Sequence, residues 1–180
     1  MMISPFAWVV PRHRGRLCLA LTVLLVCSSL WLFTMDRSLA SEEAPRGIVS
    51  FELAGDAGRS EAILSSWSGH ARALALLIQG ADYLYLIVYA LWFSLAVQLL
   101  AQRLGGAWQK LGLGVSWLVL LAAPLDAVEN YALIQQLLYG ASAHYAAMAW
   151  WCAVPKFVLV GMAAGFLAIA GIRWVVKEVL

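Results

Sequence analysis

Ionisable and amide side chains interrupt three long apolar stretches of this sequence. The densest group is Asp126, Glu129 and Asn130, whose i, i+3 and i+4 spacing places them on one face of a helix. Asp82 and Lys156 interrupt two other stretches. In apolar surroundings such groups could carry protons, hold a cation or, for Asp126 or Glu129, act as a general base in an enzyme. The pattern therefore predicts a polar site inside an apolar protein, without naming a reaction.

Hydrogen-bonding side chains recur at helical spacing around these charges. The candidate ligand-binding cluster consists of Asp82, Asp126, Glu129, Asn130 and Lys156, with Gln79, Tyr85, Tyr89 and Tyr131 as hydrogen-bond partners. Three acids against one lysine leave an excess of two negative charges. That excess requires protons on carboxyl groups, an external cation or the cationic group of a ligand.

Four apolar segments are long enough to span a membrane. Hydrophobic residues make up 63% of the 180-residue chain and the mean hydropathy is +0.82, far above that of an average soluble domain. The segments cover residues 17–35, 73–102, 111–136 and 146–172. Each exceeds the roughly 18 residues that indicate a spanning helix. We therefore expect an all-α integral membrane protein, with one domain over residues 1–180 built as a four-helix transmembrane bundle.

Basic residues predict how these segments are oriented. Three precede the first segment, two bracket the loop between the second and third, and two follow the fourth: Arg12, Arg14 and Arg16, then Arg103 and Lys110, then Arg173 and Lys177. The outer loop at 36–72 mixes acids with arginines, and the turn near 140–145 has no lysine or arginine. The positive-inside rule then predicts a cell-membrane protein with both termini in the cytoplasm.

The N-terminal segment has a second interpretation. Ser38, Leu39 and Ala40 before Ser41 resemble the cleavage site of a signal peptide, which would remove residues 1–40. Its apolar run of 19 residues is longer than the roughly 7–15 of a signal peptide. That length favours a retained first helix.

The outer loop contains the pattern of a short amphipathic helix. Ile63, Leu64 and Trp67 share one helical face, and Asp56 or Ser60 could cap its start. Such a helix lies on the membrane surface or plugs the outer end of the bundle. Because most helices of this kind are simple anchors, the surface position is the favoured interpretation.

Counting residues from the basic ends predicts which charges meet. Asp126 is 16 residues from Lys110, and Lys156 is 17 residues from Arg173. At 1.5 Å per residue both lie roughly 24–26 Å from the inner charges, so we expect Asp126 to contact Lys156. The same count places Asp82 level with Glu129, slightly further out than Asp126 and Lys156.

Two prolines lie beside the predicted cluster. Pro124 and Pro155 each remove a backbone donor and free a carbonyl about one turn earlier in their helices. Irregular backbone is tolerated at membrane depth where protein or a polar cavity satisfies it. The prolines therefore favour a shaped site at this depth.

Other patterns predict few partners. No histidine spacing indicates a metal site, no motif indicates a cofactor, and no basic run is long enough to bind nucleic acid. Gly161 and Gly165 allow close packing of the last helix, within the chain or in a homodimer. Membrane lipids are the other expected partners.

Four short motifs carry a resemblance to a group of proteins. They are Phe51-Glu-Leu-Ala, Ala62-Ile-Leu-Ser-Ser-Trp67, Asp82-Tyr-Leu-Tyr and Asp126-Ala-Val-Glu-Asn130. Over roughly residues 48–135 the chain resembles small bacterial four-span integral membrane proteins of unassigned function. The resemblance implies a bacterial inner membrane and the same architecture, and no activity. Membrane ceramidase-like hydrolases are excluded because their metal needs several histidines within the membrane.

These observations favour recognition of a small amphipathic or lipid-like molecule, or of a cation, in the outer half of the bundle. Lys156 would hold an anionic group or the charge of Asp126. Asp82 and Glu129 would carry protons or bind a cation, with Asn130 orienting them. Two alternatives stay open: a structural or assembly subunit in which the cluster only fixes helix packing, and a small membrane enzyme.

Overall fold

The computed structural model describes residues 4–179, with side chains described up to residue 177. Only helices, turns and loops occur in this part of the chain. The elements are α1 (Pro11–Asp36), the 3-10 helix η1 (Arg37–Leu39), α2 (Ile48–Glu52), α3 (Ala57–Ser66), α4 (Gly69–Leu104), α5 (Gly106–Val119), α6 (Ala122–Tyr139) and α7 (Ala143–Val179). The expected all-α bundle is confirmed.

Four helical stretches within the described residues are long and apolar enough to cross a membrane. They are Pro11–Leu39, Gly69–Leu104, Gly106–Tyr139 and Ala143–Lys177. Each extends beyond the apolar run that predicted it, because the helices continue through the polar residues at their ends. The third stretch consists of α5 followed by α6.

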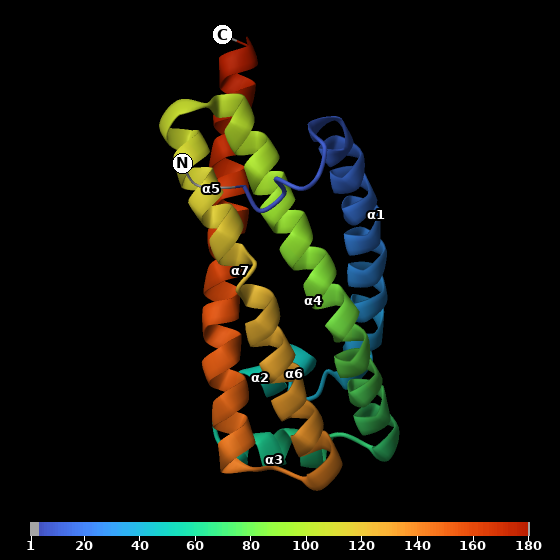
Figure 1. Ribbon diagram of the computed structural model, residues 1–180. Coiled ribbons are helices and arrows are strands. Elements are labelled where there is room, and N and C mark those ends of the chain that lie inside the picture. The colour runs from blue at the N-terminus through green and yellow to red at the C-terminus, as the bar shows by residue number, and fades with distance from the viewer. Residues whose placement is uncertain (1–3, 180) are drawn as a thin grey trace.

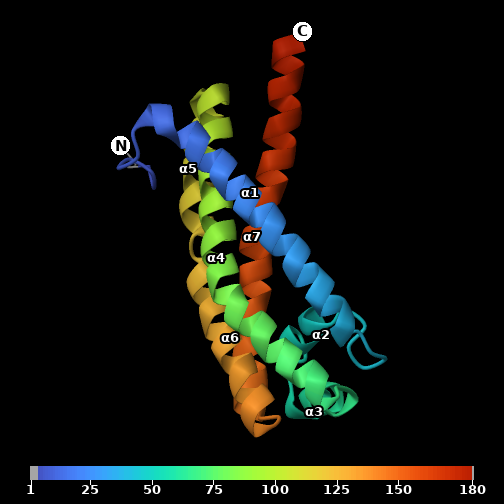
Figure 2. The ribbon, with the colours of Figure 1, turned by 90° about the vertical axis from the view of Figure 1, so that its right-hand side faces the viewer.

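The long helices form one elongated bundle (Figure 1). α4, α6 and α7 pack together over one half of its length, and α4, α5 and α7 over the other, while α1 packs mainly against α4. Figure 2 shows α1 crossing the bundle obliquely. The labelled N- and C-termini both lie at the end of the bundle away from α3 (Figure 1).

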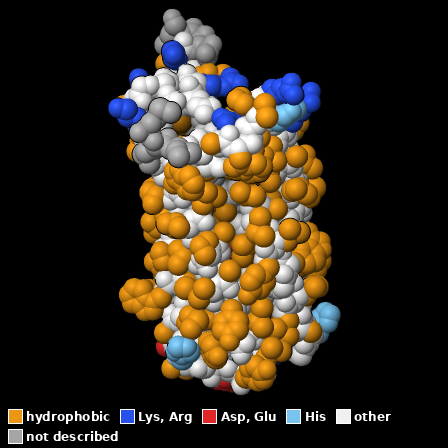
Figure 3. Space-filling view, in the orientation of Figure 1, with side chains coloured by type: hydrophobic (Ala, Val, Ile, Leu, Met, Phe, Trp, Pro, Cys, Tyr) orange, Lys and Arg blue, Asp and Glu red, His pale blue; other side chains and the backbone are white. Residues whose placement is uncertain are grey.

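The two ends of the bundle differ in charge. Lys and Arg side chains gather at the end that holds the termini, which we call the basic end (Figure 3). Its basic residues include Arg12, Arg16 and Lys110, all of them exposed. Apolar side chains cover the surface between the ends, as expected for a surface that faces lipid (Figure 3). We call the opposite end, which α2 and α3 cover, the plugged end.

The third stretch has a break just before Asp126, Glu129 and Asn130, which are buried on α6. α5 ends at Val119 and α6 begins at Ala122. Pro124 has no N–H to donate to the carbonyl of Leu120, so the regular ladder stops one turn before the proline, as its position predicts. α7, in contrast, continues through Pro155.

The short helix α3 plugs the bundle instead of lying on the membrane surface, so the favoured anchor position is wrong. Asp56 caps it, with Oδ1 accepting a hydrogen bond of 2.9 Å from the Arg59 amide. Ile63, Leu64 and Trp67 are 0%, 1% and 5% exposed. Their apolar face is buried in one hydrophobic cluster with residues of α6 and α7, among them Leu133 and Ala149.

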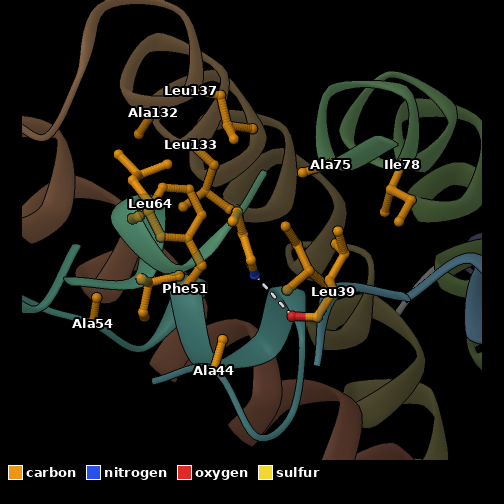
Figure 4. Packing of buried hydrophobic residues seen from close by; sticks show 14 residues of the cluster. Leu39, Ala44, Phe51, Ala54, Leu64, Ala75, Ile78, Ala132, Leu133 and Leu137 are labelled. Atoms are coloured by element: carbon orange, nitrogen blue, oxygen red, sulfur yellow. Dashed lines mark hydrogen bonds between the residues drawn. The ribbon is translucent and has the colours of Figure 1, made fainter. Parts of the chain in front are cut away.

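The segment before α3 is held against the same core. The indole N–H of Trp67 donates to the carbonyl oxygen of Leu39 at 2.8 Å, and Trp67 packs edge-on against Phe51 with ring centroids 5.5 Å apart (Figure 4). The amide of Ile48 donates to Asp36 Oδ1 at 2.7 Å at the start of α2. These contacts fix α2, and its last residue, Glu52, therefore has a defined position.

The closest approach of α5 to its neighbours occurs at Gly112 and supplies a first prediction. A Cβ atom added at Gly112 would collide with the side chains of Ala101 and Phe166. Gly112→Ala should therefore lower the free energy of unfolding by about 1–3 kcal/mol through overpacking. Gly114→Ala is the matched control, since its Cβ would meet nothing within 4 Å. Thermal unfolding of the detergent-solubilised variants checks this, and equal melting temperatures would contradict it.

Candidate functional site

Lys156 on α7 lies at the centre of a buried ion cluster. Its Nζ donates to Asp126 Oδ1 at 3.0 Å and to Glu129 Oε1 at 2.9 Å, and lies 2.8 Å from Glu129 Oε2. Glu52 Oε2 is 3.6 Å from the same nitrogen. The predicted contact between Asp126 and Lys156 is present. We call the four side chains Glu52, Asp126, Glu129 and Lys156 the ion cluster.

Glu52 is the member that the sequence did not predict. It comes from α2 in the outer loop, yet it is only 7% exposed. Burial raises the pKa of Glu52 above its ordinary value, the negative charge of Asp126 adds to the rise, and the nearby Lys156 opposes it. The apolar neighbours Phe51 and Leu53 were the available signal, since a loop acid between such residues is more readily buried than one among polar residues.

A second set of contacts joins α4 to the cluster. The hydroxyl of Tyr89 donates to Asp126 Oδ2 at 2.8 Å, so both oxygens of Asp126 are bonded. Asn130 Nδ2 donates to Asp82 Oδ2 at 2.7 Å. Within the described residues no basic side chain lies within 4 Å of Asp82. Four acids therefore surround one lysine, and Asp82 is the acid without a cation.

The remaining candidates lie around this centre in different ways. The hydroxyl of Tyr85 accepts a hydrogen bond of 3.1 Å from Ser29 on α1. Gln79 is buried on α4, with Nε2 unpaired. Tyr131 is 48% exposed and packs against Tyr145 with ring centroids 6.1 Å apart, so the structure does not bring it to the cluster. One residue beyond Asn130, it is rotated by about 100° around the helix.

A cavity of about 240 Å³ lies beside the ion cluster. It is lined by Val49, Glu52, Asp82, Tyr85, Tyr89, Phe93, Asp126, Lys156, Phe157 and Val160. The lining combines carboxyl and phenol groups with the apolar side chains of Phe93, Phe157 and Val160. Phe157 is 40% exposed, so the lining reaches the lipid-facing surface of the bundle. The cavity could hold a molecule with one polar and one apolar end.

The donor set of the cluster suits an ammonium better than a metal ion. Within residues 4–177 no three His, Cys, Asp or Glu side chains are arranged to hold a metal. Lys156 Nζ already occupies the space between the carboxylates of Asp126 and Glu129. The site can therefore hold protons or bind a cationic organic group next to Asp82.

Fold and site together define the class: a helical bundle with four helices of membrane-spanning length and an ion cluster buried among them. No protein-family model matches the chain. No curated protein and no solved structure is significantly similar to it. The resemblance to small bacterial four-span membrane proteins stays a prediction.

Proposed function

We propose that the protein binds a small amphipathic molecule with a cationic polar end, in the cavity beside the ion cluster. The observation that carries the proposal is Asp82, an acid on the cavity wall that has no basic side chain within 4 Å among the described residues. An ammonium group would supply that partner, and the apolar remainder would lie against Phe93, Phe157 and Val160. The aromatic face of Tyr85, one turn from Asp82 on α4, would add cation–π attraction.

The contacts of Lys156 support a cationic ligand over an anionic one. Its ammonium is directed to Asp126 and Glu129 and lies near Glu52. An anionic ligand would have to displace one of these carboxylates and would then lie among the others, which like-charge repulsion opposes. Of the two roles expected for Lys156, holding the charge of Asp126 is the one its contacts support.

We also propose that the protein lies in a cell membrane, in bacteria the inner membrane, with the plugged end outside and both termini in the cytoplasm. The support is the concentration of Lys and Arg at the basic end (Figure 3). A homodimer through Gly161 and Gly165 stays a prediction; a Cβ at either glycine would meet nothing within 4 Å in the described chain. That open face is available for a second copy.

The binding proposal is tested by calorimetric titration of the purified protein in a neutral detergent. The probes are n-octylammonium, n-octanol and n-octanoate, which share one chain length and differ in charge. We expect octylammonium to bind at least about tenfold more tightly than the other two, because hydrogen bonds to charged groups contribute roughly 1.5–3 kcal/mol. Asp82→Asn should weaken octylammonium binding about tenfold or more.

The control removes the same charge elsewhere. Glu42 is exposed in the connection before α2, so Glu42→Gln should leave the affinity unchanged. Equal affinities for the three probes, or an Asp82→Asn variant that binds like the parent, would overturn the proposal. The salt bridges of Lys156 favour one alternative function, that of a structural subunit in which the cluster only fixes helix packing. That alternative predicts no binding heat above the detergent blank and an Asp82→Asn effect on stability alone.

A further inference from the structure

Several deeply buried polar atoms between the ion cluster and the plugged end have no protein partner. Gln136 is 0% exposed, and neither its Nε2 nor its Oε1 is hydrogen-bonded. Gln79 Nε2, Ser60 Oγ and Asn130 Oδ1 are likewise buried and unpaired. Buried polar groups of this kind are generally hydrogen-bonded to bound water.

These atoms occur at successive levels between the ion cluster and the plugged end, and we call this series of levels the polar route. Gln136 is seven residues beyond Glu129 on α6, which is two turns along the same face and about 10 Å nearer the plugged end. Gln79 is one turn beyond Asp82 on α4 in the same direction. Ser60 lies on the buried face of α3, the helix that covers this end. The polar route thus begins at the ion cluster and ends at α3.

The route leads to solvent through a thin cover. Arg59 and Glu61, the neighbours of Ser60, are both exposed on the other face of α3. A water bound beneath α3 would therefore be separated from the outside by a single short helix. Local opening of such a peripheral element requires far less free energy than opening of the bundle core.

Toward the basic end, a layer of mutually hydrogen-bonded serines and apolar side chains follows the ion cluster. The hydroxyls of Ser94 on α4 and Ser116 on α5 are 2.9 Å apart, and each donates to the other's carbonyl oxygen, at 2.7 and 2.8 Å. Beyond them Val97, Val119 and Phe166 belong to one apolar cluster. The polar atoms of this layer are satisfied without water, so it separates the ion cluster from the basic end.

We infer that bound water molecules connect the ion cluster to the plugged end, and that the cluster exchanges protons with solvent on that side alone. Gln136 and Gln79 would bind these waters, and Ser60 would bind the one beneath α3. Gln98 Nε2, also unpaired, lies beyond the Ser94–Ser116 layer and belongs to the basic side. The inference stands apart from the proposed ligand, because water can occupy this route whether or not the cavity binds an amphipathic cation.

The first test is the direction of a stability change. If water satisfies the Gln136 amide, Gln136→Leu should lower the melting temperature by about 2–4 °C for each hydrogen bond lost. If the amide is dry and unpaired, leucine removes two buried unpaired atoms and the melting temperature should rise, which would overturn the inference. Leu138→Gln, at an exposed position two residues along α6, controls for the exchange of these residue types.

A second measurement does not depend on a variant that folds. Water-edited solid-state NMR of the parent protein in lipid bilayers reports magnetisation that passes from water to nearby protons. We expect rapid transfer to the side-chain amides of Gln136 and Gln79 and slow transfer to the side chains of Val119 and Phe166. Slow transfer to both glutamines, or equally rapid transfer on the two sides of the Ser94–Ser116 layer, would contradict the inference.

Discussion

Lys156→Met is expected to lower the free energy of unfolding by about 3–5 kcal/mol, because it leaves buried carboxylates without their cation. Lys156 is 6% exposed, and Asp126 and Glu129 are 3% and 0% exposed, so bulk solvent does not screen the charges that are left unpaired. Methionine matches the length of the lysine stem, and the loss therefore reports on the charge and not on packing volume. Protonation of the carboxyl groups would remove the unpaired charges. The loss of unfolding free energy should therefore become smaller as the pH falls.

Thermal unfolding of the purified variant in detergent measures this loss. Lys110→Met is the matched control, since Lys110 is exposed at the basic end and its removal should change the melting temperature little. A Lys156→Met variant as stable as the control would show that the carboxyl groups do not need the ammonium. The ion cluster would then have no role in holding the helices together.

Combined substitutions test whether Asp126 and Lys156 act as an isolated ion pair that only holds the helices together. If Asp126 and Lys156 formed an isolated pair, Lys156→Met with Asp126→Leu would restore stability, because an apolar pair can replace a buried ion pair. In the structure, carboxylate oxygens of Glu129 and Glu52 also lie within 4 Å of Lys156 Nζ. We therefore expect partial recovery from the double change and further recovery when Glu129→Gln is added.

The sequence predicted the parts of this fold that depend on local rules. Hydropathy and length predicted the four long helices. Pro124 and Pro155 were both expected to disturb their helices, but only the third stretch breaks, just before Pro124, while α7 continues through Pro155. Counting along regular helices predicted the contact between Asp126 and Lys156, because the rise per residue is fixed once both helices are anchored by basic residues. Each of these inferences needs only one helix or one pair of helices.

The parts that the sequence did not predict depend on tertiary packing of the outer loop. Composition could not decide whether the apolar face of Ile63, Leu64 and Trp67 would meet lipid or the bundle, since both bury apolar area. Glu52 was missed for the same reason: its burial follows from where α2 is held, and that position is set by contacts with Trp67 and Asp36, which are distant in sequence.

The second large effect is expected at the plug. Trp67→Ala should lower the free energy of unfolding by about 3–5 kcal/mol, the usual range for deleting a buried aromatic side chain. Trp67 is 5% exposed, packs against Phe51 and donates to the Leu39 carbonyl, which would lose its partner. Its removal disconnects α2 and α3 from the bundle. Limited proteolysis should then cleave within residues 40–68 faster than in the parent protein.

Two controls separate the contributions of Trp67. Trp151→Ala removes the same side chain from an exposed position, where Trp151 is 70% exposed, and should leave the melting temperature and the cleavage rate nearly unchanged. Trp67→Phe keeps an aromatic ring in the core but loses the indole donor. It should therefore lie between the parent and Trp67→Ala. A Trp67→Ala variant that resists proteolysis like the parent would contradict the assignment of α3 as a plug.

The plug and the ion cluster should also prove coupled, because Trp67 holds the segment that delivers Glu52 to Lys156. In the parent protein, Glu52→Gln removes a buried carboxyl group and should change stability measurably. In the Trp67→Ala background α2 is no longer held in place, so Glu52 is already away from Lys156 and the same substitution should have little further effect. A double-mutant cycle measures this non-additivity, which is expected only for residues that act through a shared arrangement. Strictly additive effects would mean that Glu52 reaches the cluster without the plug, and that the other contacts of α2, such as the bond to Asp36 and the buried side chains of Ile48 and Phe51, hold it in place.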